Sequence, residues 1–407
     1  MEHPLPLSSR AAATPASIAS IAPAAPLGSG ASVGILSTFP PTRCGLATFS
    51  EALAGALVDA HGASVSTVRV MDELAVPGST PPMRGVEVVA ELTAGDPASI
   101  AGAAAALNRS DVAVIQHEYG IFGGADGDEV IAVMEELVVP VIVVLHTVLE
   151  TPSERQRLVL ERVAALADAV VVMTAVAHEI LERRYSVDQR KVGVIAHGVP
   201  VWTAGPDRAG DDDRRQIITW GLIGPGKGIE WGIRAMAHLR DAGVRARYTV
   251  HGQTHPKVVA HQGEAYRESL AALVAELGLT DEVVLDGRYL DPSQLAAAIA
   301  EADAVLLPYD SRNQVTSGVL VEALAAGRPV VATSFPHALE LLGGRRGRAV
   351  AHQDPAAMAQ ALEEVLRDAG SAADELGASV DPTVLSWPEA AGRFLALAER
   401  LRLERAA

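Results

Sequence analysis

From Ser32 onward, short apolar runs of strand length alternate with longer segments of helical periodicity. A strand followed by a helix and a second strand indicates a βαβ unit, whose strands pair in parallel. In the first half of the chain we expect strands at residues 33–37, 66–70, 86–89, 112–116, 141–145, 169–173 and 192–195. In the second half we expect them at residues 217–219, 247–251, 283–285, 304–307, 330–333 and 349–351. The pattern predicts an α/β protein with two mainly parallel sheets.

The chain is long enough for two such domains. Residues 201–215 are rich in Gly, Pro, Asp and Arg and lack periodicity, which indicates a linker. We therefore expect two doubly wound, Rossmann-like domains, residues 31–200 and 216–384, which face a central cleft. Residues 1–30, mostly Ala, Pro and Ser, are expected to form a disordered tail. Residues 385–407 are expected to form a helix that packs back on the first domain.

A small, glycine-containing turn precedes a helix in the segment 314–322, between the strands at 304–307 and 330–333. The backbone N–H groups of Gly318, Val319 and Leu320 would be free to bind a phosphate at this helix N-terminus. Glu322 lies one turn further, where a carboxylate suits hydroxyl groups, such as those of a ribose. The pattern favours a nucleoside diphosphate that carries a sugar. The alternative is an ordinary αβ unit in which Glu322 complements the helix dipole.

A second phosphate-type loop, Gly221 to Gly228, follows the strand at 217–219 and leads into a helix at 229–240. Its glycines allow close approach of the backbone to a ligand, and Lys227 adds a positive charge. In a Walker A loop a Ser or Thr would follow the lysine and hold magnesium, but here Gly228 takes that place. The loop is therefore expected to bind a leaving diphosphate without a metal.

The formal net charge of −17 disfavours nucleic acid and strongly anionic membrane surfaces as partners. Cys44 is the only cysteine, so no disulfide can form within the chain, and a reducing cytoplasm is the expected compartment. No apolar run reaches the length of a transmembrane helix. We expect no strong membrane association.

Polar residues follow several other strands, at positions where parallel sheets commonly hold active sites. His117 and Glu118 are expected on a loop after the strand at 112–116, either as acceptor contacts or as a solvated pair. His146 ends the strand at 141–145, either as a site residue or as a capping or core-edge histidine, and Gly252 lies in the turn after 247–251. Arg43 and Gly45 lie in the loop after the first strand. Neither His117 nor Glu118 has metal-ligand spacing with another His or Cys, so no metal is proposed.

The order of these segments resembles the GT-B glycosyltransferases of family 4, the retaining nucleotide-sugar enzymes also described as glycosyl transferases group 1. The resemblance runs from about Ser32 to about Ala396. Its most specific part is the pair formed by the Gly221–Gly228 loop and the segment 314–333, with His146 and the His197-Gly198-Val199 turn upstream.

The resemblance implies a role for each matching residue. Lys227 would bind the donor diphosphate, Glu322 would hold the ribose, and His146 would lie at the reacting centre. The implied catalytic residues are His146, Lys227 and Gln314. The implied donor contacts are Gly45, Gly221, Lys227, Gly252, Gln314, Ser317, Gly318, Val319, Leu320 and Glu322. The implied acceptor contacts are His117, Glu118 and Arg43.

Two positions depart from the family pattern. Gln314 replaces the first glutamate of the Glu-x7-Glu motif, and Leu222 replaces an arginine of the lysine loop. Glutamine can still bond sugar hydroxyls, but it supplies no negative charge. The expected activity is retaining transfer of a hexose, with mannose or glucose favoured, from a nucleoside-diphosphate sugar to the hydroxyl of a sugar-containing acceptor. A nucleotide-sugar epimerase, a phosphorylase and a non-catalytic nucleotide-sugar binding protein remain alternatives.

Overall fold

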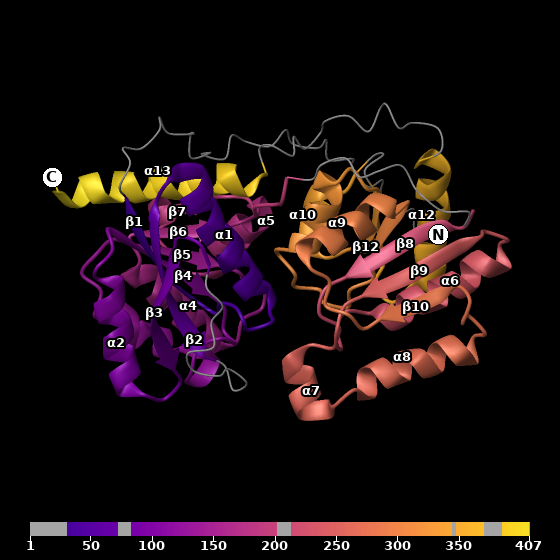
Figure 1. Cartoon of the computed structure of the whole chain (residues 1–407), viewed down its shortest axis with the longest axis horizontal. Coiled ribbons are helices and arrows are strands. Elements are labelled where there is room, and N and C mark those ends of the chain that lie inside the picture. The colour runs from indigo at the N-terminus through magenta and orange to yellow at the C-terminus, as the bar shows by residue number, and fades with distance from the viewer. Residues whose placement is uncertain (1–30, 72–82, 202–212, 344–346, 370–384, 407) are drawn as a thin grey trace, which may run out of the picture.

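The computed structural model describes residues 31–71, 83–201, 213–343, 347–369 and 385–406. The described residues form two α/β domains that lie side by side (Figure 1). Two of the expectations, the tail at 1–30 and most of the linker at 201–215, lie outside the described residues.

The first domain is built on a parallel sheet of seven strands in the order β3-β2-β1-β4-β5-β6-β7. This doubly wound order reverses direction between β1 and β4, which is where such folds bind ligands. The strands are β1 (Ser32–Ser37), β2 (Ser64–Met71), β3 (Val86–Thr93), β4 (Val112–His117), β5 (Val141–Leu145), β6 (Ala169–Val172) and β7 (Val192–Val194).

The second domain holds a parallel sheet of six strands in the order β10-β9-β8-β11-β12-β13. Its order reverses between β8 and β11. The strands are β8 (Arg215–Trp220), β9 (Ala246–His251), β10 (Val283–Asp286), β11 (Ala304–Leu307), β12 (Val330–Thr333) and β13 (Gly347–Val350).

Helices cover both faces of each sheet, and their first residues show why they begin where they do. In α4 a capping box joins Ser153 and Gln156, and in α9 the same device joins Asp291 and Gln294. The helices are α1 (Gly45–His61), α2 (Pro97–Leu107), α3 (Glu129–Glu135), α4 (Glu154–Leu166), α5 (Ala175–Arg184), α6 (Ile229–Asp241), α7 (Pro256–Gln262), α8 (Ala265–Glu276), α9 (Pro292–Glu301), α10 (Gly318–Ala325), α11 (Pro336–Leu341), α12 (Pro355–Ala369) and α13 (Trp387–Ala406).

The last helix, α13, returns to the first domain and packs against α1 (Figure 1). Phe394 and Leu401 of α13 join Leu53 and Leu57 of α1 in one buried cluster that also contains Ile35 of β1. The first and the last described elements, β1 and α13, therefore lie in the same domain.

Several elements differ from the expected bounds by a few residues. The linker was expected to extend to residue 215, but Arg215 begins β8 because it pairs with Ala246 of β9. Helix α1 begins at Gly45, because the Cys44 side chain accepts from the N–H of Ala47 and caps it. Within the described residues, no helix has the length and apolar character needed to cross a bilayer.

Candidate active site

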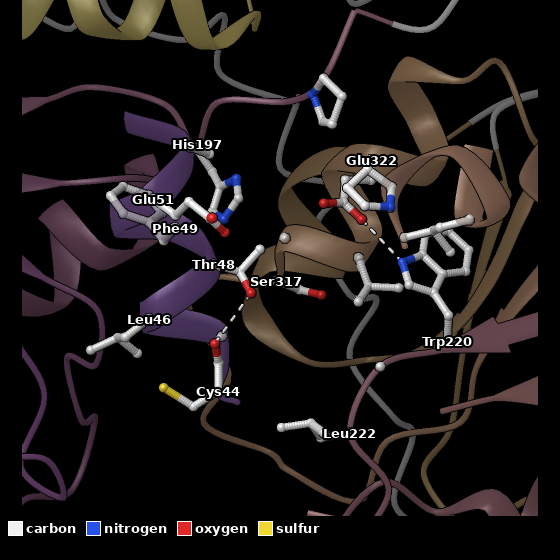
Figure 2. Close-up of a pocket in the computed structure, with 18 of the residues that line it drawn as sticks. Cys44, Leu46, Thr48, Phe49, Glu51, His197, Trp220, Leu222, Ser317 and Glu322 are labelled. Carbon is white, nitrogen blue, oxygen red and sulfur yellow. Dashed lines mark hydrogen bonds between the residues drawn. The ribbon is translucent and has the colours of Figure 1, made fainter. Parts of the chain in front are cut away.

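A cleft of about 1000 Å³ lies between the two domains and is lined by residues of both. Loops at the carboxyl ends of the strands and the helix α1 supply much of its walls, as expected for doubly wound sheets. Figure 2 shows Leu46 and Glu51 of α1 on one side and Ser317 and Glu322 of the second domain across from them.

The N-terminus of α10 opens on this cleft. Gly318 and Val319, its first two residues, line the cleft, and the start of a helix leaves their N–H groups without helical partners. The third amide differs from the expectation, because the N–H of Leu320 donates to the Ser317 hydroxyl at 3.3 Å. Leu320 is fully buried and does not line the cleft. Two amides of this helix start, rather than three, therefore remain available to a ligand in the cleft.

His197 of the first domain packs against the same helix start. A Cβ atom added to Gly318 would lie 2.9 Å from His197 Nε2, so a larger residue there would collide with the ring. His197 Nδ1 is 2.7 Å from the Gly198 carbonyl oxygen, which can only accept, so Nδ1 carries the proton. Burial lowers the pKa of His197 to about 4, and the ring is neutral near pH 7.

The lysine loop departs from a Walker A loop for a steric reason. Gly228, the N-cap of α6, has φ 62°, and a Cβ atom there would lie 1.9 Å from the Pro308 carbonyl oxygen. A Ser or Thr could not occupy that position without moving the backbone. Lys227 lines the cleft, with its Nζ 4.4 Å from the centre of the Tyr309 ring. An ammonium over an aromatic face is held by a cation–π interaction.

Glu322 lines the cleft from α10 and accepts a hydrogen bond from Trp220 Nε1 at 3.0 Å (Figure 2). Trp220 ends β8, so the end of one central strand orients the carboxylate. Burial raises the pKa of Glu322 to about 7, against the opposing effect of the Trp220 hydrogen bond. The carboxyl group therefore changes its charge close to neutral pH.

His146 follows β5 and lines the cleft from the first domain. Its Nε2 lies 2.7 Å from Gln116 Oε1, and Phe49 packs edge-on against the ring at 4.8 Å between centroids. Burial, then the neighbouring His197 and His117, lowers the pKa of His146 to about 3. A neutral ring that donates from Nε2 keeps Nδ1 as an acceptor.

The three expected acceptor contacts have different surroundings. Glu118 lines the cleft, and its carboxylate accepts from the Thr147 hydroxyl and from the N–H of Tyr119 at 3.0 Å. Burial raises the pKa of Glu118. The other two, His117 and Arg43, do not line the cleft.

His117 was expected on a loop, but this is wrong. It is the last residue of β4, paired with Leu145 of β5, and its side chain is fully buried. Arg43 is exposed and joins the two domains instead, donating to Gln253 Oε1 at 2.8 Å and lying over the Tyr289 ring.

The remaining expected site residues all line the cleft: Gly45, Gly221, Gly252, Gln314 and Ser317. Gln314 donates from its side-chain amide to the Thr316 carbonyl oxygen at 3.1 Å. Leu222 lines the cleft as well, where the family pattern has an arginine.

Sequence reasoning missed several residues that line the cleft, including Glu51, Thr147, Arg288 and Tyr309. Arg288 and Tyr309 lie just after β10 and β11, so their position after a strand was an available signal. Glu51 lies inside α1 and carries no such signal. In the part of the chain that the structure describes, no three His, Cys, Asp or Glu side chains are grouped as ligands for a metal.

Residues 214–368 match the family described as Glycosyl transferases group 1. A curated relative from Nocardioides sp., named D-inositol 3-phosphate glycosyltransferase, is 31% identical over 276 residues. The match covers 63% of this chain and 58% of the relative, so the chain spans less than two thirds of that relative's length.

Two solved structures share the whole two-domain architecture. A glycosyltransferase from Rickettsia africae has a TM-score of 0.63 at 13% identity and covers 92% of this chain and 97% of its own. HepE of Anabaena, in complex with UDP, has a TM-score of 0.63 at 16% identity. The match covers 92% of this chain and 98% of the HepE chain. At these identities the likeness concerns the fold, and it confirms the expected GT-B architecture.

Proposed function

We propose that this chain is a glycosyltransferase with a nucleoside-diphosphate sugar as donor, because residues 214–368 match the family described as Glycosyl transferases group 1. One observation carries the proposal. The cleft places Lys227 and the start of α10, from the second domain, in one cavity with His146 from the first. A cation and free amides suit a diphosphate, and a polar group on the other wall suits the reacting sugar.

In this proposal Lys227 and the amides of Gly318 and Val319 bind the diphosphate, and Glu322 accepts hydrogen bonds from the ribose. The matched structure of HepE was also solved with UDP-glucose. UDP-glucose is therefore a suitable first donor to test here, beside other nucleoside-diphosphate hexoses.

The proposed reaction breaks the bond between the sugar and the diphosphate and forms a bond to an acceptor hydroxyl on the same face of the sugar. The transferred hexose is proposed to be mannose or glucose. Negative charge grows on the departing diphosphate, and the preorganised amides and Lys227 stabilise it. Positioning of donor and acceptor between two domains excludes water, which favours transfer over hydrolysis.

The acceptor is proposed to bind against the first domain, whose wall of the cleft carries the carboxylates of Glu51, Asp59 and Glu118. Such a wall repels a phosphate group and accepts hydrogen bonds from hydroxyl or amine groups. We propose a sugar-containing acceptor without a phosphate at this wall. The curated relative is named for a phosphorylated acceptor, so the two proteins would differ here.

Product analysis tests the function. The chain is incubated with nucleoside-diphosphate glucoses and mannoses, with and without a panel of neutral, amino and phosphorylated sugar acceptors, and products are identified by mass spectrometry. A glycosylated acceptor with release of nucleoside diphosphate is expected. A new nucleotide sugar formed without acceptor would indicate an epimerase, and tight donor binding with no product would indicate a binding protein.

Donor binding is expected to weaken as pH falls, because Glu322 titrates near 7. The ionised carboxylate accepts bonds from two ribose hydroxyls, and only about a tenth of the molecules remain ionised one unit below the pKa. The Kd for the best sugar nucleotide should rise about tenfold between pH 8 and pH 6. Calorimetry measures this, and Glu322→Gln should give a weaker Kd that no longer changes with pH. An equal pH dependence in both proteins would assign the effect to another group.

Transfer is proposed to need no metal ion or other cofactor. The sequence has no Asp-x-Asp motif beside either nucleotide loop, and Lys227 provides the charge that a metal would supply. Activity is expected to be unchanged in EDTA. Loss of activity on chelation, with recovery in manganese or magnesium, would contradict the metal-free site.

We place the reaction in the cytoplasm, where the single Cys44 would stay reduced. The strongly negative net charge supports an acceptor that is neither a nucleic acid nor held at an anionic membrane surface.

A further inference from the structure

One buried residue of α11, His337, holds the turn that precedes α10 through two hydrogen bonds. His337 Nδ1 accepts a hydrogen bond from the N–H of Ser317 at 2.9 Å. The backbone N–H of His337 donates to the Gln314 carbonyl oxygen at 3.3 Å. Both ends of the turn are therefore tied to the same residue, whose side chain is only 3% exposed.

His337 holds this turn as a neutral ring. Burial, then the neighbouring His197, lowers the pKa of His337 to about 3. An Nδ1 that accepts from an amide carries no proton, so the ring is the Nε2–H tautomer. His337 does not line the cleft and thus has no direct contact with a ligand there.

The same helix and turn are also tied to the first domain. Glu340, one turn after His337, accepts from the N–H groups of Ala175 at 3.0 Å and Val176 at 2.8 Å, at the start of α5. Val315, inside the turn, is buried in the core of the first domain, and its carbonyl oxygen accepts from Thr174 Oγ1 at 3.0 Å. The turn is therefore fixed between both domains.

We propose that His337 is a positioning residue for the donor: it sets the turn so that the amides of Gly318 and Val319 meet the diphosphate. This inference rests on the proposed function of the α10 N-terminus. Its physical basis is the Ser317 N–H, which belongs to a buried residue and has His337 Nδ1 as its acceptor. If that acceptor is removed, the amide must find another partner, and the turn moves.

Three substitutions at His337 test the role. In His337→Asn, Oδ1 is bonded to Cγ, as Nδ1 is in histidine, so an acceptor stays close to the position of Nδ1. His337→Gln displaces the acceptor by one further bond, and His337→Leu removes it. We expect the donor Kd to rise about tenfold or more in His337→Leu and His337→Gln, and by less than about threefold in His337→Asn. The acceptor KM should stay within about twofold in all three.

The pattern of donor Kd values among the variants distinguishes a positioning role of His337 from a general effect on the stability of the protein. Thermal unfolding of each variant shows whether it is folded, and the pair His337→Gln and His337→Asn carries the test if His337→Leu does not fold. A folded His337→Gln or His337→Leu with the parent donor Kd would overturn the inference. Equal losses of donor affinity in His337→Asn and His337→Gln would overturn it as well.

The outcome also distinguishes this inference from the proposed function. If the parent chain binds no nucleoside-diphosphate sugar, the proposed function fails and the inference fails with it. If the parent binds donor and transfers sugar while the variants bind equally well, only the role of His337 is wrong.

Discussion

His146→Ala is expected to lower the rate of transfer at saturating donor by about 10²-fold or more, which is the scale of losing one positioned polar catalytic group. The donor Kd should change by less than about twofold. His146 reaches the cleft from the first domain, whereas Lys227, Glu322 and the α10 amides come from the second. His146 should therefore contribute mainly to the transition state.

The neutral form of His146 matters for this expectation. Because burial lowers the pKa of His146 to about 3, the ring is uncharged between pH 6 and 8, so it acts as a hydrogen-bonding group and not as a cation. The hydrogen bond with Gln116 holds its orientation. The rate loss in His146→Ala should thus be nearly independent of pH between 6 and 8.

Both quantities must be measured, because a rate alone cannot separate binding from chemistry. His178→Ala is a matched control, since His178 lies on α5 and does not line the cleft. A folded His146→Ala protein that binds donor and transfers sugar at the parent rate would reduce His146 to a packing residue beside Phe49. It would also weaken the proposed reaction.

Lys227→Ala is expected to weaken binding of both the sugar nucleotide and the free nucleoside diphosphate. A lost hydrogen bond to a charged group costs about 1.5–3 kcal/mol, or about 10- to 150-fold in Kd. This loss of affinity should be smaller at high salt, because dissolved ions screen the charge of Lys227, which is accessible in the cleft. A nucleoside without phosphates should bind the parent and Lys227→Ala equally.

Lys191→Ala provides the control for Lys227→Ala. Lys191 lies in the first domain and donates to the Ala167 carbonyl oxygen at 2.8 Å, outside the cleft. Its removal deletes the same charge from the protein without touching the proposed site. Unchanged calorimetric affinity in Lys227→Ala would mean that the diphosphate binds elsewhere.

Much of the fold could be predicted from local pattern. The strands at 141–145, 304–307 and 330–333 were predicted to the residue. These are short runs of Val, Leu, Ile, Ala and Thr that are buried on both faces, and proline precedes two of them and follows the third. Such runs are typical of parallel strands between two helical layers. Strands with polar residues at their ends, such as β4 and β8, were predicted too short.

The candidate site was predictable where it depends on position after a strand. Lys227, His146 and Glu322 were singled out from the strands and helix starts next to them, and all three line one cleft. The failures share one cause, which is that burial and pairing are not local. Gln116 and His117 are polar, yet both are fully buried at the end of β4, the central strand of the first sheet. Arg43 contacts Gln253, 210 residues away in the chain.

The sequence by itself therefore determined the two parallel sheets and the loops that could bind a donor, because periodicity and helix starts act over a few residues. Only the tertiary structure decided which N–H groups remain free at α10, which histidines line the cleft, and that His337 holds the turn that precedes α10. Those properties depend on which side chains meet when the two domains pack, and a hydrogen bond between segments distant in the chain leaves no periodic signal in either segment.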